Sequence, residues 1–274
     1  MYLPDVTVDH YRTDPERRRR TLGRRFLRRP FWFYGRYVVL VIWSGLKFTF
    51  TRDPQKSVTL QARRVMRISE RHGADLEFIG LDRFHAEGAP YVFACNHMGT
   101  FEVNALPGLV ASRIPMTFVV KRSLLRTPFF GKVLRRLGAI PVERRHPGED
   151  LMQVLEEGSR LLAQGISVIL FPESTRQDIF SPKKFNSLAV KLALRAGVPV
   201  VPVALRTDFW GTGRKIKEFG PLDFDRPVRI EFGEPLVPSG RGKNEHQRVL
   251  DFIRTRLEDW GSPVENPPEE TEDR

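Results

Sequence analysis

A histidine and a carboxylate follow the apolar run Tyr91–Cys95, and together these two residue types could move a proton. On one continuous helix, His97 and Glu102 would lie about 140° apart around the axis and could not pair. They can meet if His97 lies in a strand-to-helix loop and Glu102 in the first helical turn, with Thr100 as the N-cap. The carboxylate would then hold one ring nitrogen and leave the other free to accept a proton. A histidine that merely caps the loop is the alternative interpretation.

A second polar group follows the apolar run Ile166–Phe171, in the order Pro, Glu173, Ser174, Thr175 and Arg176. An arginine that leaves the carboxyl end of a buried strand can bind a phosphate through two parallel hydrogen bonds, and the threonine hydroxyl can add another. Ligands of open α/β sheets gather at this edge. The alternative is an Arg–Glu ion pair that closes the loop.

Two further cations follow apolar runs: Lys121 comes after Met116–Val120, and Arg144 shortly after Ile140–Val142. Both could line the same rim of the sheet. No second histidine or similar ligand stands near His97, so the sequence predicts no metal site. Cys95 is the one cysteine of the chain, which excludes a disulfide framework.

Alternation of strand-like and helix-like segments predicts an α/β domain with a central, mostly parallel or mixed sheet flanked by helices. The expected strands are Leu76–Ile79, Tyr91–Cys95, Met116–Val120, Ile140–Val142, Ile166–Phe171 and Val200–Leu205, with a further pair, Lys215–Phe219 and Val228–Phe232, at the sheet edge. The expected helices are Pro54–His72, Thr100–Val110, Leu124–Leu137, Asp150–Ala163, Ser187–Ala196 and Asn244–Trp260.

Composition and the N-terminal segment point to a polyanionic partner. The 274 residues include 45 Lys and Arg against 33 Asp and Glu, a net charge of +12, which suits nucleic acid or an anionic membrane.

An arginine-rich stretch that ends at Arg29 precedes the apolar segment Phe31–Phe50. Arg36 and Lys47 interrupt that segment on one helical face, which favours a helix lying in the membrane interface or re-entering it. A core helix and a spanning helix are the alternatives, and no nucleic-acid-binding motif is present.

These patterns divide the chain into three parts. Residues 1–72 form basic and apolar N-terminal helices that associate with a membrane, 73–240 form the α/β domain, and 241–274 hold a C-terminal helix and an acidic tail. The Pro-rich, acidic segment 261–274 is expected to be disordered.

Four ordered blocks of the sequence resemble those of the glycerolipid acyltransferases, the family of lysophosphatidate and glycerol-3-phosphate acyltransferases. The blocks are AsnHis–x4–acid, a Lys…ProPhe…Gly…GlyAlaIleProValGluArg segment, PheProGlu–x–ThrArg and ValValProValAla, within roughly residues 75 to 240. The resemblance implies that His97, oriented by Glu102, is the general base. It would remove the acceptor hydroxyl proton as that oxygen attacks an acyl thioester of coenzyme A or acyl carrier protein.

The resemblance also implies roles for other residues. Lys121 would stabilise the developing oxyanion, and the acceptor phosphate would lie against Arg144, Glu173, Thr175 and Arg176. Asn96 and Ser174 would support the site. The reaction would need no covalent enzyme intermediate, no metal and no organic cofactor.

Departures from the family pattern concern the acceptor pocket more than the reaction. Glu102 stands where Asp is usual, Ser174 where Gly is usual, and Phe185–Asn186–Ser187 where Lys–Gly is usual. We expect a membrane-associated 1-acylglycerol-3-phosphate acyltransferase that makes phosphatidate at the cytoplasmic face of the plasma (inner) membrane. The alternatives are an acyltransferase for another lyso-lipid or glycerol-3-phosphate, and a non-catalytic membrane-surface binding protein; nucleic acid is the disfavoured partner.

Overall fold

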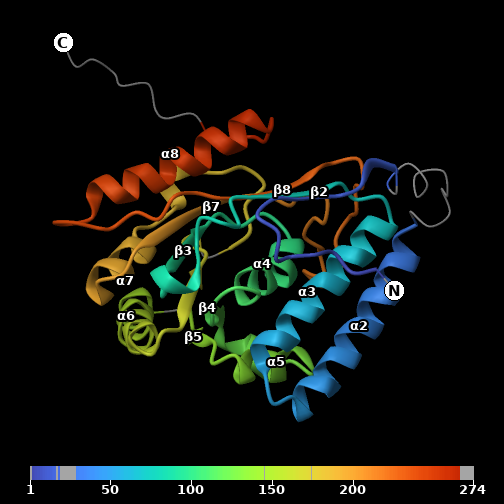
Figure 1. Ribbon diagram of the computed structural model, residues 1–274, viewed down its shortest axis with the longest axis horizontal. Helices are drawn as coiled ribbons and strands as arrows, with labels where there is room; N and C mark the ends of the chain where they lie inside the picture. Colours follow the sequence, from blue (N-terminus) through green and yellow to red (C-terminus); the bar gives the residue numbers. More distant parts are fainter. Residues whose placement is uncertain (1, 17, 19–28, 145, 174, 266–274) are drawn as a thin grey trace.

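The computed structural model describes residues 2–16, 18, 29–144, 146–173 and 175–265. A mixed sheet of eight strands, in the order β1-β2-β8-β7-β3-β6-β4-β5, crosses the molecule with helices on both faces (Figure 1). The strands are β1 (Tyr11–Arg12), β2 (Leu76–Ile79), β3 (Val92–Cys95), β4 (Met116–Lys121), β5 (Ile140–Val142), β6 (Ser167–Leu170), β7 (Val200–Arg206) and β8 (Val228–Phe232). The helices are α2 (Pro30–Phe50), α3 (Pro54–Arg71), α4 (Phe101–Ala111), α5 (Phe130–Arg136), α6 (Pro147–Ala163), α7 (Leu188–Ala196) and α8 (Lys243–Asp259).

Five strands, β7, β3, β6, β4 and β5, form a continuous parallel section of the sheet. Parallel strands are covered on both faces, which explains why each of them reads as an unbroken apolar run. The carboxyl ends of parallel strands meet at one edge of the sheet. The loops after β3, β4, β5 and β6, which carry the predicted site residues, therefore leave the sheet on the same side.

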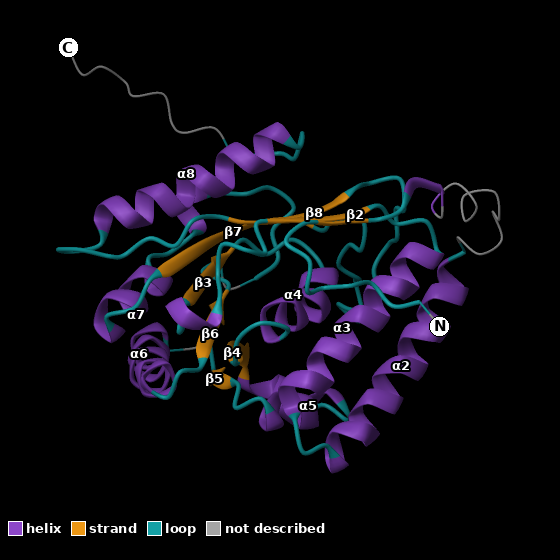
Figure 2. Cartoon of the chain, viewed as in Figure 1, coloured by secondary structure: helices purple, strands orange, loops and turns teal. Residues whose placement is uncertain are grey.

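Each face of the sheet has its own hydrophobic core. In β3, Phe93 and Cys95 point to one core, and Val92 and Ala94 to the other, as the period of two in a strand requires. Helices α6, α7 and α8 cover one face, and α2, α3, α4 and α5 lie on the other (Figure 2). Glycines with positive φ follow α5, α6 and α7 at the expected positions, Gly138, Gly165 and Gly197.

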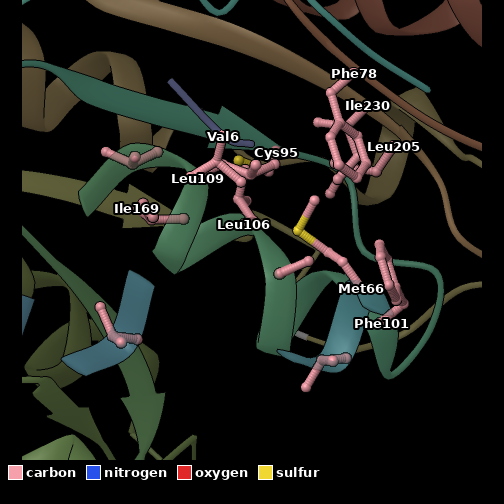
Figure 3. Close-up of a cluster of buried hydrophobic side chains, with 14 of the residues drawn as sticks. Val6, Met66, Phe78, Cys95, Phe101, Leu106, Leu109, Ile169, Leu205 and Ile230 are labelled. Atoms are coloured by element: carbon pink, nitrogen blue, oxygen red, sulfur yellow. The ribbon is translucent and has the colours of Figure 1, made fainter. Parts of the chain in front are cut away.

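Residues from the N-terminal part of the chain share the larger core with the α/β domain. Figure 3 shows Val6 and Met66 of that part among side chains from β2, β3, α4, β7 and β8. Helix α2 joins the same core through one face, where Phe33 and Tyr37 contact the buried ring of Trp210 at centroid distances of 4.8 and 4.7 Å.

The other face of α2 exposes large apolar side chains to solvent. Phe31, Val39 and Phe50 are 76%, 67% and 85% exposed, and Trp32, Val38, Ile42, Trp43 and Leu46 are exposed as well. Among the described residues, no helix combines the length and apolar composition that a bilayer crossing requires.

Two predicted strands need correction. Lys215–Phe219 forms no strand but a loop, and it pairs with no strand among the described residues. Val228–Phe232 is a strand, β8, but it lies inside the sheet between β2 and β7 rather than at the edge. The antiparallel pairing of β8 with β7 makes the sheet mixed.

Two other expectations also need correction. The predicted helix Leu124–Leu137 is broken, because Thr127 before Pro128 takes an extended conformation and α5 starts only at Phe130. In the tail, the described residues up to Glu265 are ordered, since Phe180 exchanges backbone hydrogen bonds with Pro263 and Glu265. Residues 266–274 lie outside the described part of the chain, as do six of the nine N-terminal arginines, Arg17, Arg19, Arg20, Arg24, Arg25 and Arg28.

Candidate active site

The His97 ring and the Glu102 carboxylate are in contact. His97 lies in the loop after β3, Glu102 lies in the first turn of α4, and Nδ1 of His97 is 2.9 Å from Oε1 of Glu102. The Glu102 side chain is fully buried, whereas 12% of the His97 side chain is exposed. The ring also lies 4.5 Å from the Phe171 ring, which limits its rotation.

Glu102 is held in its ionised form by a set of hydrogen-bond donors. The backbone N–H groups of Met98 and Gly99 donate to Oε1 at 2.8 and 2.6 Å, and the Thr207 hydroxyl donates to Oε2. Burial raises the pKa of this carboxyl, but the hydrogen bonds from His97, Thr207 and Gly99 outweigh burial and leave the pKa below its usual value.

The ionised state of Glu102 fixes the tautomer of His97. An ionised carboxylate can only accept hydrogen bonds, so Nδ1 of His97 carries the proton and donates. Nε2 then has a free lone pair and can accept a proton.

The predicted cap on α4 is different from the observed one. Thr100 occupies the N-cap position but its hydroxyl caps no backbone N–H. Glu102 accepts hydrogen bonds from the backbone N–H groups of Met98 and Gly99 in the loop instead. The same carboxylate therefore orients the histidine and secures the loop, two tasks that the sequence assigned to different residues.

Asn96 is a structural support of this loop. Its side chain donates to the carbonyl oxygen of Leu205 and accepts from the backbone N–H of Leu205, both at 2.8 Å. It thereby extends the pairing of β3 with β7 past the end of the ladder and fixes where the loop begins.

Glu173 lies behind the histidine loop, outside the residues that line the cavity. Its Oε2 accepts the backbone N–H of His97 at 2.6 Å, the side chain is buried, and Oε1 has no hydrogen-bond partner among the described residues. Burial, together with the nearby charge of Glu102, raises the pKa of Glu173 to about 8. In the described conformation it contacts the His97 loop, not the position where an acceptor phosphate was expected.

A cavity of about 900 Å³ opens beside His97. Its lining includes five of the predicted site residues: His97, Lys121, Arg144, Thr175 and Arg176. Lys121 ends β4 and the others come from the loops after β3, β5 and β6, as expected for the carboxyl edge of the sheet. Ser174, the remaining predicted residue, lies outside the described residues.

The two arginines of the cavity are held in different ways. Arg144 has a φ of 64°, and its backbone N–H donates to Asp150 of α6 at 2.7 Å, which secures the turn after β5. The Arg176 guanidinium donates to the Lys217 carbonyl oxygen at 3.0 Å and lies 3.8 Å from the Glu218 carboxylate. The ion-pair alternative for Arg176 thus holds in part, but with Glu218 rather than Glu173.

Much of the cavity lining is apolar. Apolar side chains of α2, α4 and α5 and of the segment before α5 contribute to it, namely Val38, Val41, Ile42, Val103, Pro107, Leu124 and Phe130. Val38 and Ile42 are also exposed on α2, so this apolar part of the lining adjoins the exposed apolar face of that helix.

Several residues of the site were not found from the sequence. Thr207 follows β7 directly and binds Glu102; a polar residue at a strand's carboxyl end is the signal that could have indicated it. Phe171 belongs to the predicted strand run and gave no sign of its contact with His97. Lys217 and Glu218 come from the loop that was mistaken for a strand, and Lys191 lies on α7.

Comparison with known proteins finds related sequences. Residues 75–206 match the model of a family described as Acyltransferase. The chain is 31% identical over 173 residues to the 1-acyl-sn-glycerol-3-phosphate acyltransferase of Pseudomonas aeruginosa, covering 63% of each chain. It is 28% identical over 167 residues to the enzyme of the same name from Escherichia coli, covering 61% of this chain and 65% of that one. The chain thus spans just under two thirds of the length of these relatives.

One solved structure resembles the whole fold. The crystal structure of the 1-acyl-sn-glycerophosphate (LPA) acyltransferase from Thermotoga maritima aligns with a TM-score of 0.62 and 20% sequence identity. The alignment covers 90% of this chain and 100% of that one, which establishes the α/β fold with its mixed sheet flanked by helices.

Proposed function

Because residues 75–206 match the model of the acyltransferase family, we propose that the protein transfers a fatty acyl group from a thioester to the hydroxyl of a lysophosphatidate. The observation that carries this proposal is the His97–Glu102 pair at the wall of a cavity that also contains Arg144 and Arg176. A base, an anion site and an apolar compartment are the three features that acylation of a phosphorylated lipid requires.

His97 acts as the general base in the proposed reaction. Nε2 takes the proton of the acceptor hydroxyl while that oxygen attacks the thioester carbonyl carbon, and a tetrahedral oxyanion forms. When the carbon–sulfur bond breaks, the imidazolium returns the proton to the leaving thiolate. Glu102 stabilises the imidazolium in between, so neither a metal nor an organic cofactor enters the sequence.

Positively charged side chains of the cavity bind the acceptor phosphate and stabilise the oxyanion that forms during the reaction. Arg144 and Arg176, with the Thr175 hydroxyl, bind the acceptor phosphate, and Lys121 stabilises the oxyanion. The residues that support this assignment come from different loops but line one cavity. Arg176 must exchange its contact with Glu218 for the phosphate.

The apolar part of the cavity accommodates an acyl chain. A glycerol-3-phosphate acceptor would leave the donor chain as the only occupant of that part, whereas a lysophosphatidate brings a chain of its own. The adjoining exposed face of α2 favours an acceptor drawn from a bilayer, since Val38 and Ile42 belong to both surfaces.

Membrane docking through α2 is part of the same proposal. One face of the helix is fixed in the protein core and the other exposes Phe31, Val39 and Phe50, as in a helix that lies in the interface of a bilayer. The net charge of +12 suits the anionic cytoplasmic leaflet of the plasma membrane. The acyl donor is a thioester of coenzyme A or of acyl carrier protein, both of which are acidic.

Release of free thiol from an acyl thioester, dependent on added lysophosphatidate, tests the reaction. We expect His97→Ala to lower kcat by roughly 10²–10⁴-fold, the usual contribution of a positioned general base. His85→Ala is the matched control because His85 is exposed and does not line the cavity.

Equal rates for the wild type and His97→Ala would show that His97 is not the general base. A wild type that binds lysophosphatidate without releasing thiol would instead favour the non-catalytic membrane-surface binding protein. Repeating the assay with glycerol-3-phosphate and with other lyso-lipids identifies the acceptor.

A further inference from the structure

The loop Gly211–Gly220, between β7 and β8, carries apolar side chains on the protein surface. Ile216 is 58% exposed and Phe219 is 42% exposed. Three exposed cations, Arg214, Lys215 and Lys217, surround them. A single exposed apolar residue is ordinary on a protein surface, but an apolar pair within a cluster of cations matches the boundary between lipid headgroups and acyl chains.

The loop is fixed against the N-terminal half of α2. The Tyr34 hydroxyl donates to the Gly220 carbonyl oxygen, and the Tyr34 ring lies 4.9 Å from the Phe219 ring. Nε1 of Trp210 donates to the Glu218 carbonyl oxygen at 2.9 Å. Phe219 is therefore held beside the end of α2 that exposes Phe31 and Trp32, so that the exposed side chains of the loop and of the helix adjoin.

The loop also borders the active-site cavity. Lys217, Glu218 and Phe219 line it, and Arg176 is bonded to the Lys217 carbonyl oxygen and lies close to the Glu218 carboxylate. A lipid that leaves the bilayer next to this loop would meet Arg176 directly.

We infer that Gly211–Gly220 is a second membrane-docking loop, which inserts Ile216 and Phe219 into an anionic bilayer and places Arg214 and Lys215 at the lipid phosphates. Within the described residues, neither Arg214 nor Lys215 forms an ion pair with a carboxylate of the protein, so both charges are free to meet an anionic surface. The inference rests on the proposed docking of α2, because the two surfaces are continuous, but it does not depend on the acyl transfer itself.

An acidic carrier protein is the other partner that these cations could meet. The apolar surroundings favour the bilayer: the loop extends an apolar face of α2 that alone exposes eight large side chains, namely Phe31, Trp32, Val38, Val39, Ile42, Trp43, Leu46 and Phe50. A surface of that extent and composition fits a lipid interface better than the charged surface of a small acidic protein.

A fluorescent probe at position 216 tests insertion directly. Cys95, the one cysteine of the chain, is buried with no exposed surface, so Ile216→Cys can be labelled selectively with an environment-sensitive nitrobenzoxadiazole group. On vesicles of phosphatidylglycerol and phosphatidylcholine, we expect a blue shift of its emission and quenching by lipids that carry a spin label on the acyl chain. Val237→Cys, at a position 75% exposed outside the loop and α2, is the matched control and should show neither effect.

Replacement of the two cations tests the electrostatic part. Arg214→Ala and Lys215→Ala should each weaken binding to the anionic vesicles roughly fivefold at low salt and leave binding to pure phosphatidylcholine vesicles unchanged. The thermal unfolding temperature of each variant should equal that of the wild type, because both side chains are exposed.

Three results would overturn the inference. The first is a labelled position 216 that stays in water while the protein is bound to vesicles. The second is unchanged vesicle binding of the cation variants together with slower transfer from acyl carrier protein, which would assign the loop to the donor protein. The third is a wild type that binds no vesicles. The proposed reaction is tested separately, by comparing thiol release by the wild type and by His97→Ala.

Discussion

At the scale of single residues, the site depends on one carboxylate that is buried without being neutralised. Glu102 accepts hydrogen bonds from a histidine, two backbone N–H groups and a hydroxyl. Burial of a carboxylate on its own would favour the protonated form, which could not hold the His97 tautomer. The donors reverse that preference, so that Glu102 can stabilise an imidazolium when His97 takes a proton.

Thr207 is predicted to be a positioning residue that acts through Glu102. Thr207→Val keeps the side-chain shape but removes the donor to Oε2, so the pKa of Glu102 rises toward its usual range or above. We expect the acid limb of the pH profile of kcat/KM to move to higher pH and kcat to fall. Thr207→Ser, which restores the hydroxyl, should restore the profile; an acid limb that stays in place for Thr207→Val would show that the hydroxyl does not support the carboxylate.

Glu173 is predicted to make the fold sensitive to alkaline pH. Its pKa is about 8 in the folded protein against an ordinary value of 4.5, so the folded state binds the proton more tightly. Its contribution to stability is therefore complete below about pH 4.5 and is lost as the pH rises through 8, by a few kcal/mol in order of magnitude.

Glu173→Gln should remove this dependence, because an amide keeps an oxygen for the His97 N–H and does not ionise. The unfolding temperature of the variant minus that of the wild type should increase by roughly 5–10 °C between pH 5 and pH 9. A constant difference across that range would mean that Glu173 does not titrate there.

At the scale of elements, the local sequence pattern predicted those strands and helices whose formation depends on neighbouring residues. Buried parallel strands such as β3 and β6 read as short apolar runs because both faces are covered, and their carboxyl ends placed the candidate residues on one rim. The contact between His97 and Glu102 could also be predicted, because His97 follows a strand end and Glu102 lies in the first turn of the next helix.

Long-range pairing was not predictable in this way. The position of β8 between β2 and β7 depends on strands far away in the chain, and two-residue β1 is too short to show a period. The segment Lys215–Phe219 lies in a loop whose Phe219 ring packs against Tyr34 of α2, a contact with a distant part of the chain that the local pattern does not show. Likewise, Thr207 and Phe171 gained their roles only when the folded sheet brought them to His97 and Glu102.

The packing of α2 against the segment before α5 leads to an element-scale prediction. A Cβ atom at Gly45 would lie 2.7 Å from the Cα atom of Phe129. We expect Gly45→Ala to lower the free energy of unfolding by about 1–3 kcal/mol, because main-chain atoms must move apart.

Gly35→Ala on the same helix is the matched control. No described residue lies within 4 Å of a Cβ atom at Gly35, so the intrinsic helix propensity decides, and the variant should gain about 0.5–1 kcal/mol in free energy of unfolding. Denaturant unfolding measures both. Equal effects of the two substitutions would mean that α2 does not approach Phe129 closely in solution.

At the scale of the whole molecule, the fold joins a membrane surface to a catalytic one. The core that holds Phe33 and Phe48 of α2 also holds the strands that carry the site, so α2 cannot move away without disturbing them. Deleting the chain up to Thr51 would remove those two core residues together with the exposed ones. Substitution of exposed side chains is therefore the sharper test of docking.

We expect the triple variant Phe31→Ser, Val39→Ser and Phe50→Ser to bind anionic vesicles at least about 100-fold more weakly than the wild type. Each of these side chains is at least two thirds exposed, and transfer of one large apolar side chain from water contributes about 1.5–3 kcal/mol. The deficit should persist at 1 M salt, where the Debye length is about 3 Å, whereas binding of the wild type should weaken with salt because its net charge is +12. Val237→Ser, an exposed apolar residue outside α2, is the control. If the triple variant binds as the wild type does and salt alone abolishes binding, then the membrane contact is electrostatic and α2 does not enter the bilayer.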